Sequence, residues 1–449
     1  MARVPRVRVV VLNYDGGEMT LRCLRALRAV DWPQDSLEIM LVDNASIDGL
    51  APRIRREMPW VRLIENTHNA GFAGGCNVGL RDLDGVDYVA LLNNDTIPDR
   101  NWLRPLVDTL EADSELGAAS SKMVFAPAFV TLTVESPTFR PSDQGSELGV
   151  KLTGLIVDGV EVWEHTQFAD GCHAGQTRGS GVEQICWTDA RAEIRVPIEP
   201  GAPLPEVVEV ELAAERPKVA RLSGGGTTVE AAVAEKPSWH RVPLAGRAYD
   251  VINNVGSRLV LGGYGGDRGF LEPDVGQYEQ PEEVFAWCGG AVLLSVRYLR
   301  DVGIFNERYF MYYEDTDLAW RGRIAGWRYR YVPESVVRHV HAASSKEGSK
   351  LFVHFVERNR FLTLARNAPW WMLAEASYVY LRDTAVIFER DCLRRLIRRA
   401  RPSPGLVKLR LRAYAGFLKL LPTTLVARWR QHASTADREE IVRRWAVPQ

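Results

Sequence analysis

Apolar runs alternate with helical patterns through the first hundred residues, and this alternation constrains the fold more than any other feature of the sequence. The runs are VRVVVLN (7–13), LEIMLVD (37–43), VRLIEN (61–66) and DYVALLNND (87–95), and amphipathic or glycine-rich stretches separate them. Continuous apolar runs are typical of strands that are covered on both faces. Strands that alternate with helices predict an α/β fold with a mostly parallel sheet and right-handed crossovers.

Polar residues close three of these runs. Asn13-Tyr14, Asp43-Asn44 and Asn93-Asn94-Asp95 each follow an apolar strand. In open parallel sheets, ligands bind beyond the carboxyl ends of the strands, so we expect the three polar tips to form one site. Taken alone, Asp95 is an ordinary turn residue, but at this edge its carboxylate is placed to hold Mg²⁺ against a diphosphate. Asp43 is either a cap or an acceptor for a donor group of a nucleobase or ribose.

The segment NAGFAGGCNVG (69–79) is predicted to be a glycine-rich loop. Its glycines do not match the dinucleotide fingerprint GxGxxG, and it does not follow the first strand. We expect the glycines to let the backbone approach a ligand, with Asn69 and Asn77 as hydrogen-bond donors.

The sequence texture changes between residues 128 and 248. Short alternating segments such as FVTLTVE and VVEVELAAE are separated by proline, glycine and serine, and no helical pattern interrupts them. This pattern predicts an inserted antiparallel β-sandwich. We therefore expect four parts: residues 1–127 and 249–369 as two halves of one α/β domain, the insertion at 128–248, and a helical region at 370–449.

A second group of chemically capable residues lies in YYEDTDLAWR (312–321). Glu314, Asp315 and Asp317 are either acids of a helical first turn or a source of a general base. His339 and His341 are two residues apart in an extended stretch and point in opposite directions, so at most one is expected to join the same site.

The bulk composition narrows the class of protein. The 449 residues carry 56 basic and 57 acidic side chains, which argues against a nucleic-acid binder that works by net charge. The six cysteines form no CxxC pair, as expected of reduced thiols in a cytoplasmic protein. The apolar run near the N-terminus is too short for a signal peptide, and no run reaches the length of a membrane span. Basic amphipathic helices are expected beyond residue 370, which either pack on the chain itself or lie on an anionic membrane surface.

Taken in order, these motifs resemble the family 2 glycosyltransferases of the GT-A fold. The resemblance covers roughly residues 7–127 and 250–367. It is carried by VVLNYDG, LVDNASIDG, NAGFAGGCNVG, LLNNDTIPD, FAWCGGAVLL, YFMYYEDTDLAWR and HVH. The family's QxxRW motif is absent, and VERNR (356–360) follows instead, which argues against processive polymer synthesis.

The resemblance implies an inverting, metal-dependent transfer of a sugar from a nucleotide diphosphate donor. It assigns Mg²⁺ or Mn²⁺ to Asp95 and His339, with His341 as a weaker choice, because Asn93-Asn94-Asp95 stands at the family's DxD position. It makes Asp315 the catalytic base with Glu314 in support, and Trp287 an acceptor contact. The residues expected to bind the nucleotide sugar are Asn13, Tyr14, Asp43, Asn44, Asn69, Gly71, Phe72, Asn77 and Asn94.

The subgroup that the chain resembles consists of rhamnosyltransferases that extend polyprenyl-diphosphate-linked sugars from dTDP-L-rhamnose. The expected partners are therefore a nucleotide sugar, a lipid-linked or cell-envelope glycan and the inner face of the cell membrane, with no nucleic acid. The insertion resembles a β-sandwich element of other bacterial glycosyltransferases, for which glycan binding, packing and dimerisation all stay open. Two alternatives remain: a glycan-binding protein on an inactive scaffold, and a sugar nucleotidyltransferase, which NYDGGEMT disfavours because it lacks a basic residue.

Overall fold

The computed structural model of the protein describes residues 3–140, 147–174, 185–340, 349–431 and 437–448. The chain forms two compact units. The first contains residues 1–124, 252–272 and 276–449, and the second contains residues 125–251 and 273–275. The expected insertion, 128–248, lies inside the second unit, whose main segment extends three residues further at each end.

A ten-stranded mixed sheet forms the centre of the first unit. Its main path runs β21-β23-β6-β22-β4-β1-β2-β3, with β18 beside β6 and β5 beside β23. β1 pairs in parallel with β2 and β4, and β2 pairs in parallel with β3, whereas β22 runs antiparallel to both β4 and β6. The strands are β1 (Val7–Asn13), β2 (Leu37–Asp43), β3 (Val61–Glu65), β4 (Tyr88–Asn93), β5 (Thr96–Pro98), β6 (Leu116–Phe125), β18 (Ile252–Asn254), β21 (Glu282–Glu283), β22 (Ala291–Ser295) and β23 (Arg328–His339).

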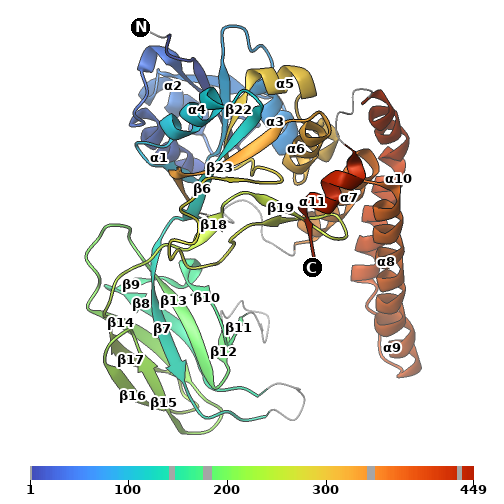
Figure 1. The fold of residues 1–449 in the computed structure, drawn as a ribbon. Coiled ribbons are helices and arrows are strands. Elements are labelled where there is room, and N and C mark those ends of the chain that lie inside the picture. Colours follow the sequence, from blue (N-terminus) through green and yellow to red (C-terminus); the bar gives the residue numbers. More distant parts are fainter. Residues whose placement is uncertain (1–2, 141–146, 175–184, 341–348, 432–436, 449) are drawn as a thin grey trace. The chain divides into compact units, whose positions relative to one another are not determined.

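Helices cover both faces of this sheet (Figure 1). On β1 the side chains alternate: Val9 and Val11 join one core with α1, α2 and α4, whereas Val10 joins the opposite core with α3 and α6. This two-sided burial explains the unbroken apolar runs of the sequence. The helices are α1 (Gly17–Arg28), α2 (Leu50–Glu57), α3 (Gly71–Leu80), α4 (Leu103–Ala112), α5 (Val296–Val302) and α6 (Glu314–Ile324). The expected α/β class with a mostly parallel central sheet is confirmed.

The glycine-rich segment is a helix, not the loop that we predicted. α3 packs directly on β1, and the glycines make this contact possible. A Cβ atom at Gly75 would lie 2.3 Å from Leu12 Cδ1, and one at Gly79 would lie 2.4 Å from Val10 Cγ2. The glycines in the helix body therefore serve close packing between helix and strand, which outweighs their low helix propensity.

The C-terminal part of the first unit is helical, as expected. α7 packs along α10, and α8 packs against both (Figure 1). A small sheet of β19, β20 and β24 lies in the same unit, with β24 parallel to β19. The elements are α7 (Lys350–Asn367), α8 (Trp370–Phe388), a π-helical turn (Glu389–Leu393), α9 (Arg394–Ile397), α10 (Gly405–Arg430), α11 (Arg438–Trp445), β19 (Ser257–Val260), β20 (Tyr264–Asp267) and β24 (Ala446–Val447).

The second unit is an antiparallel β-sandwich. One sheet has the order β10-β13-β7-β15-β16, and the other has β11-β12-β8-β14-β17 with β9 beside β8. Alternate residues such as Leu132 and Ile194 from the first sheet meet Leu152 and Val210 from the second in a shared core. The main strands are β7 (Ala128–Glu135), β8 (Lys151–Val157), β13 (Arg191–Ile198), β14 (Val207–Ala213), β15 (Lys218–Ser223), β16 (Thr228–Val233) and β17 (Ser238–Pro243). The shorter strands are β9 (Val160–Glu161), β10 (Gln167–Phe168), β11 (Cys172–Ala174) and β12 (Cys186–Thr188). The expected inserted antiparallel sandwich is therefore confirmed as a fold.

Candidate functional site

The polar tips of β1, β2 and β4 meet in one hydrogen-bonded group at the carboxyl edge of the sheet. Asn13 Nδ2 donates to Asp43 Oδ1 at 2.8 Å, and Asn13 Oδ1 accepts from Asn94 Nδ2 at 3.3 Å. The Ser46 amide donates to Asp43 Oδ2 at 3.1 Å. Asp43 is 6% exposed, and each of its oxygens keeps a further lone pair for a ligand donor. The neighbouring Tyr14 is 48% exposed, so its ring is available to a bound base.

A second asparagine group organises the turn before α3. Asn44 Nδ2 donates to Asn69 Oδ1 at 2.8 Å and to the Gly71 carbonyl at 3.1 Å, and its Oδ1 accepts from the Ala70 amide. Asn69 Oδ1 also accepts from the Gly71 amide at 2.8 Å. Gly71 has a φ of +71°, and a Cβ atom there would lie 2.3 Å from the Phe310 carbonyl oxygen. These residues bring the start of α3 against the loop that leads to Glu314 and Asp315.

Asp95 and His339 form a buried pair at the same edge. His339 Nε2 lies 3.1 Å from Asp95 Oδ1, and the residues are 9% and 8% exposed. His339 Nδ1 lies 3.0 Å from Asn253 Oδ1 on β18. A hydrogen bond from Nδ1 to a neighbouring oxygen fixes the tautomer of a ligating histidine, because a proton on Nδ1 leaves the Nε2 lone pair directed toward Asp95.

The pair fits a divalent cation. One oxygen and one imidazole nitrogen suit Mn²⁺, and Mg²⁺ also accepts a single carboxylate when phosphate and water complete its shell. Two ligands at right angles on an octahedral ion of this size lie about 3 Å apart, close to the observed separation. No group of three or more His, Cys, Asp or Glu side chains suited to a metal occurs within the described ranges. His341 lies outside the described residues.

Asp315 occupies the first turn of α6 and faces a glycine turn. Asp315 Oδ2 accepts from the Gly289 amide at 3.1 Å, and Oδ1 accepts from the Thr316 amide at 2.6 Å. Burial raises the pKa of Asp315, and the two amide hydrogen bonds oppose that rise. A carboxylate with a raised pKa is a better proton acceptor, as a general base requires.

Glu314 is more deeply placed. It is 5% exposed, and its Oε2 has no hydrogen-bond partner among the described residues. Burial, with a smaller contribution from the Asp315 carboxylate, raises the pKa of Glu314 well above its usual value. Glu314 therefore faces the protein interior, and its raised pKa favours the uncharged acid.

The turn Cys288-Gly289-Gly290 connects the two halves of the site. The Gly290 carbonyl accepts from the Asn93 amide at 2.9 Å, and the Gly289 amide donates to Asp315. A Cβ atom at Gly289 would lie 3.4 Å from the Phe72 ring and 3.7 Å from Asp315 Cβ, so the three residues are immediate neighbours. The polar strand tips, the Asp95–His339 pair and Asp315 thus belong to one edge of the sheet.

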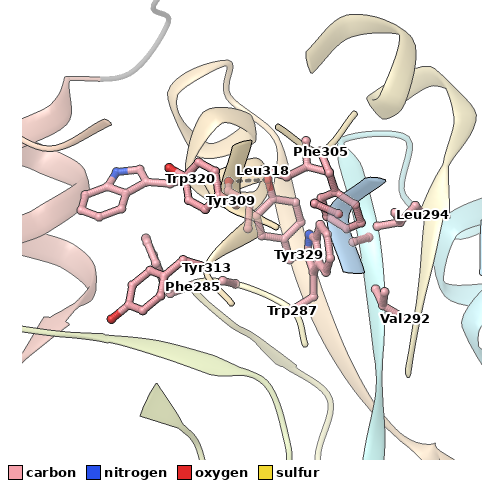
Figure 2. Packing of buried hydrophobic residues seen from close by; sticks show 14 of the residues in the cluster. Phe285, Trp287, Val292, Leu294, Phe305, Tyr309, Tyr313, Leu318, Trp320 and Tyr329 are labelled. Carbon is pink, nitrogen blue, oxygen red and sulfur yellow. Dashed lines mark hydrogen bonds between the residues drawn. The ribbon is translucent and has the colours of Figure 1, made fainter. Parts of the chain in front are cut away.

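Two predicted site residues have other roles in the structure. Asn77 is 1% exposed, and its side chain bonds the Phe305 carbonyl and amide at 2.9 and 3.1 Å, so its amide group is already used in holding α3 to the 305–307 segment. Trp287 is fully buried and packs on Phe305 with ring centroids 6.2 Å apart, among the aromatic residues of Figure 2. Core packing leaves none of the surface of Trp287 exposed, so the structure does not support the expected acceptor contact.

Two residues that support the site, Asn253 and Asn359, were not predicted from the sequence. Asn253 sits in β18, more than 80 positions from His339, and no local pattern marks it. Asn359 belongs to the VERNR segment and is fully buried in α7. Its Nδ2 donates to the carbonyls of Tyr309, Met311 and Tyr312 at 2.9, 2.8 and 2.8 Å, which fixes the backbone just before Asp315. The position of VERNR was noted from the sequence, but this role depends on tertiary contacts.

Comparison with known proteins identifies part of the chain. Residues 8–140 match the family model described as "Glycosyl transferase family 2". The chain is 39% identical over 97 residues to N-acetylglucosaminyl-diphospho-decaprenol L-rhamnosyltransferase of Mycobacterium tuberculosis, which is 21% of this chain and 31% of that protein. It is 28% identical over 171 residues to the cellulose synthase catalytic subunit (UDP-forming) of Pseudomonas fluorescens, 37% of this chain and 22% of that protein. The matched region thus spans less than a third of the length of either relative.

Two solved structures show weaker likenesses. The mannosyltransferase PcManGT from Pyrobaculum calidifontis in complex with GDP-Man and Mn²⁺ has a TM-score of 0.42 at 16% identity, covering 98% of this chain and 88% of that one. GalNAc-T7 with UDP, GalNAc and Mn²⁺ has a TM-score of 0.40 at 13% identity, covering 81% of this chain and 51% of that one.

Proposed function

We propose that this chain, whose residues 8–140 match the model of glycosyl transferase family 2, is an inverting, metal-dependent glycosyltransferase of that family. The observation that carries the proposal is the joint placement of the Asp95–His339 pair, the Asn13–Asp43 group and Asp315 at one edge of the sheet. Each group corresponds to a requirement of the reaction: a cation site for a diphosphate, polar contacts for a nucleoside, and a base for the acceptor hydroxyl.

Asp95 and His339 would hold Mg²⁺ or Mn²⁺, and the cation would neutralise charge on the departing diphosphate. Asp43, Asn13 and the exposed ring of Tyr14 would position the nucleoside. Asp315 would take the proton of the acceptor hydroxyl as that oxygen attacks the anomeric carbon, so that one displacement inverts the configuration there. The Gly289 amide holds one carboxylate oxygen of Asp315 and leaves lone pairs for the acceptor.

For the donor and acceptor we propose L-rhamnose from dTDP-L-rhamnose and a sugar carried on a polyprenyl diphosphate. The support is the rhamnosyltransferase relative, whose name contains both the diphospho-decaprenol and the L-rhamnosyl group. The activity is tested by release of nucleoside diphosphate from a panel of dTDP-L-rhamnose, UDP-glucose, UDP-N-acetylglucosamine and GDP-mannose with Mn²⁺ and a lipid-linked acceptor. No release from any donor would refute the glycosyltransferase, and release from UDP-glucose alone would refute the rhamnosyl donor.

We also propose that the C-terminal helices bind the inner face of the membrane. None of the described helices is long and apolar enough to cross a bilayer. The apolar faces of these helices differ in burial. On α10, Ala413 and Phe417 are buried although Leu406 is 42% exposed, and Phe417 packs on Phe361 of α7. On α8 and α9, Leu381, Phe388 and Leu396 are 41%, 44% and 57% exposed. Intramolecular packing therefore accounts for the Ala413–Phe417 face of α10 and leaves these three side chains of α8 and α9 exposed in the described part of the chain.

The net positive charge of the C-terminal helices supports their binding to an anionic membrane surface. Residues 370–430 contain thirteen basic and four acidic side chains, a net charge of +9 in a chain whose overall charge is −1. Some arginines pair with nearby acids, such as Arg394 with Glu389, which lowers the effective charge. Each remaining basic residue near an anionic membrane contributes about 1 kcal/mol. Co-sedimentation with anionic but not neutral liposomes, weakening as salt rises, is the expected result. Equal pelleting with both, or with neither, would remove the membrane role.

A further inference from the structure

We infer that a basic cavity between residues 302–308 and the C-terminal half of α10 binds the diphosphate of the lipid-linked acceptor. This inference rests on the proposed function for its substrate class and adds a site for it. Two adjoining cavities of about 640 and 340 Å³ make up the space. They share Arg308, Arg366, Thr423 and Ala427 in their walls, so they form one continuous region, here called the arginine cavity.

The arginine cavity has an excess of positive charge. Arg308, Arg366 and Arg430 line it, Arg321 closes its inner end, and no acidic residue is part of either wall. The fully buried Asp317 pairs with Arg321 at 2.9 Å and with Arg366 at 3.1 Å, and its carboxylate offsets part of the charge of these two guanidinium groups. In the described part of the chain, no acid lies within ion-pair distance of Arg308 or Arg430, and both are exposed.

Guanidinium groups bind phosphate better than a single point charge does. Planar guanidinium donors match phosphate oxygens in paired hydrogen bonds, and arginine keeps its charge at all relevant pH values. Gln431 adds an amide to the wall, whereas the Thr423 hydroxyl donates its proton to the Leu420 carbonyl at 2.8 Å. An anion with several oxygens can therefore find donors on more than one side of the cavity.

The remaining wall is apolar, which distinguishes a lipid diphosphate from a free one. Pro422, Val426 and Ala427 from α10 line the larger cavity, and Val302, Ile304 and Phe305 line the smaller one. Leu425 and Trp429, 37% and 71% exposed, continue the apolar surface along the same turns of α10. An isoprenoid chain attached to the diphosphate would cover this surface, whereas inorganic diphosphate would leave it in water.

Phe305 connects the arginine cavity with the base. Phe305 is one of the residues that line the smaller cavity, and its ring packs on Phe72 with centroids 6.2 Å apart; Phe72 is in turn the neighbour of Gly289 beside Asp315. The backbone of Arg308 is held by Arg358, whose Nη2 donates to the Arg308 carbonyl at 2.8 Å. The same short segment therefore contributes to the cavity on one side and to the catalytic region on the other.

The test is calorimetric titration of the full chain with farnesyl diphosphate in EDTA, which prevents capture of the diphosphate by a metal at Asp95. We expect wild type to bind farnesyl diphosphate, and the double variant Arg308→Ala/Arg430→Ala to bind at least tenfold more weakly. The matched control is Arg22→Ala/Arg100→Ala, which removes two exposed arginines outside both the cavity and residues 370–430 and should bind as wild type does. Thermal unfolding of each variant establishes that it is folded.

Two further titrants identify the source of the anion. Inorganic diphosphate should bind at least tenfold more weakly than farnesyl diphosphate, and farnesol should not compete. Equal binding of the two diphosphates would overturn the lipid assignment, and equal loss in the control variant would overturn the site. Because titration requires no turnover, failure to bind in a preparation that transfers sugar would refute this inference alone. Binding in a preparation that uses no nucleotide sugar would refute only the proposed function.

Discussion

Replacement of Asn359 tests whether the loop before Asp315 is held in a strained conformation by one side chain. Phe310, Tyr312 and Tyr313 have φ values of +65°, +67° and +70°, a region that non-glycine residues avoid. Each such residue costs on the order of 1–3 kcal/mol, so the loop persists only because its surroundings hold it. Asn359 supplies that hold through its three carbonyl contacts.

The expected loss of stability follows from the hydrogen bonds of the Asn359 side-chain amide. Its two hydrogens serve three carbonyls at 2.8–2.9 Å, and the side chain is fully buried. A buried carbonyl that loses its donor costs about 1–3 kcal/mol. We expect Asn359→Ala to lower the free energy of unfolding by about 2–3 kcal/mol. Asn359→Asp keeps the shape but replaces the donor with a carboxylate oxygen that faces three carbonyl acceptors, and should lower the free energy of unfolding further.

The effect on catalysis should be larger than the effect on stability. Once released, the strained loop can relax locally and displace Asp315, and a displacement of about 1 Å can cost roughly a hundredfold in rate. The assay pairs urea unfolding with kcat and KM for the nucleotide sugar, and Asn101→Ala, an exposed asparagine, is the control. We expect kcat to fall while KM changes little. Wild-type kcat in a folded Asn359→Asp protein would refute this explanation.

Three more predictions concern the acids and the insertion. Asp315→Asn should keep donor binding and lose at least about a hundredfold in turnover, and turnover within a few-fold of wild type would contradict the role of Asp315 as the base. The rate of the wild-type enzyme should fall as the pH drops through the raised pKa of Asp315, which lies above the usual aspartate range. Because the pKa of Glu314 is raised in the folded state, the free energy of unfolding should decline as the pH rises above the usual glutamate range. Urea unfolding at pH 5 and pH 8 should show a smaller decline for Glu314→Gln than for wild type. An equal decline in the two proteins would contradict the raised pKa of Glu314. Residues 125–251 expressed alone should give a cooperative all-β unfolding transition, and a disordered product would refute an independent unit.

The sequence was sufficient for the parts of the fold that local pattern determines. Period-two and unbroken apolar runs located the strands, and polar residues at their ends located the edge where Asn13, Asp43 and Asn94 meet. Alternation in the insertion predicted the sandwich. Each of these signals arises because one strand buries one or both of its faces, so a few consecutive residues contain the information.

The errors arose where tertiary contact overrides local preference. Glycines at 75 and 79 indicated a loop, but their lack of a Cβ is what brings α3 against β1. Trp287 lies in the segment expected near the acceptor, but its size places it in the core. Asn253 and Asn359 act through partners far away in the chain, which no spacing reveals.

The most direct test of the central claim is the release of nucleoside diphosphate from dTDP-L-rhamnose by wild type and by Asp95→Ala, with Mn²⁺ and with EDTA. We predict that EDTA stops the wild-type reaction, that excess Mn²⁺ restores it, and that Asp95→Ala loses roughly a hundred- to a thousandfold in rate, as for the loss of one preorganised electrostatic group. Asp84→Ala, at a carboxylate whose side chain is 96% exposed, should match wild type. Full activity of Asp95→Ala in EDTA would contradict the assignment of the cation site.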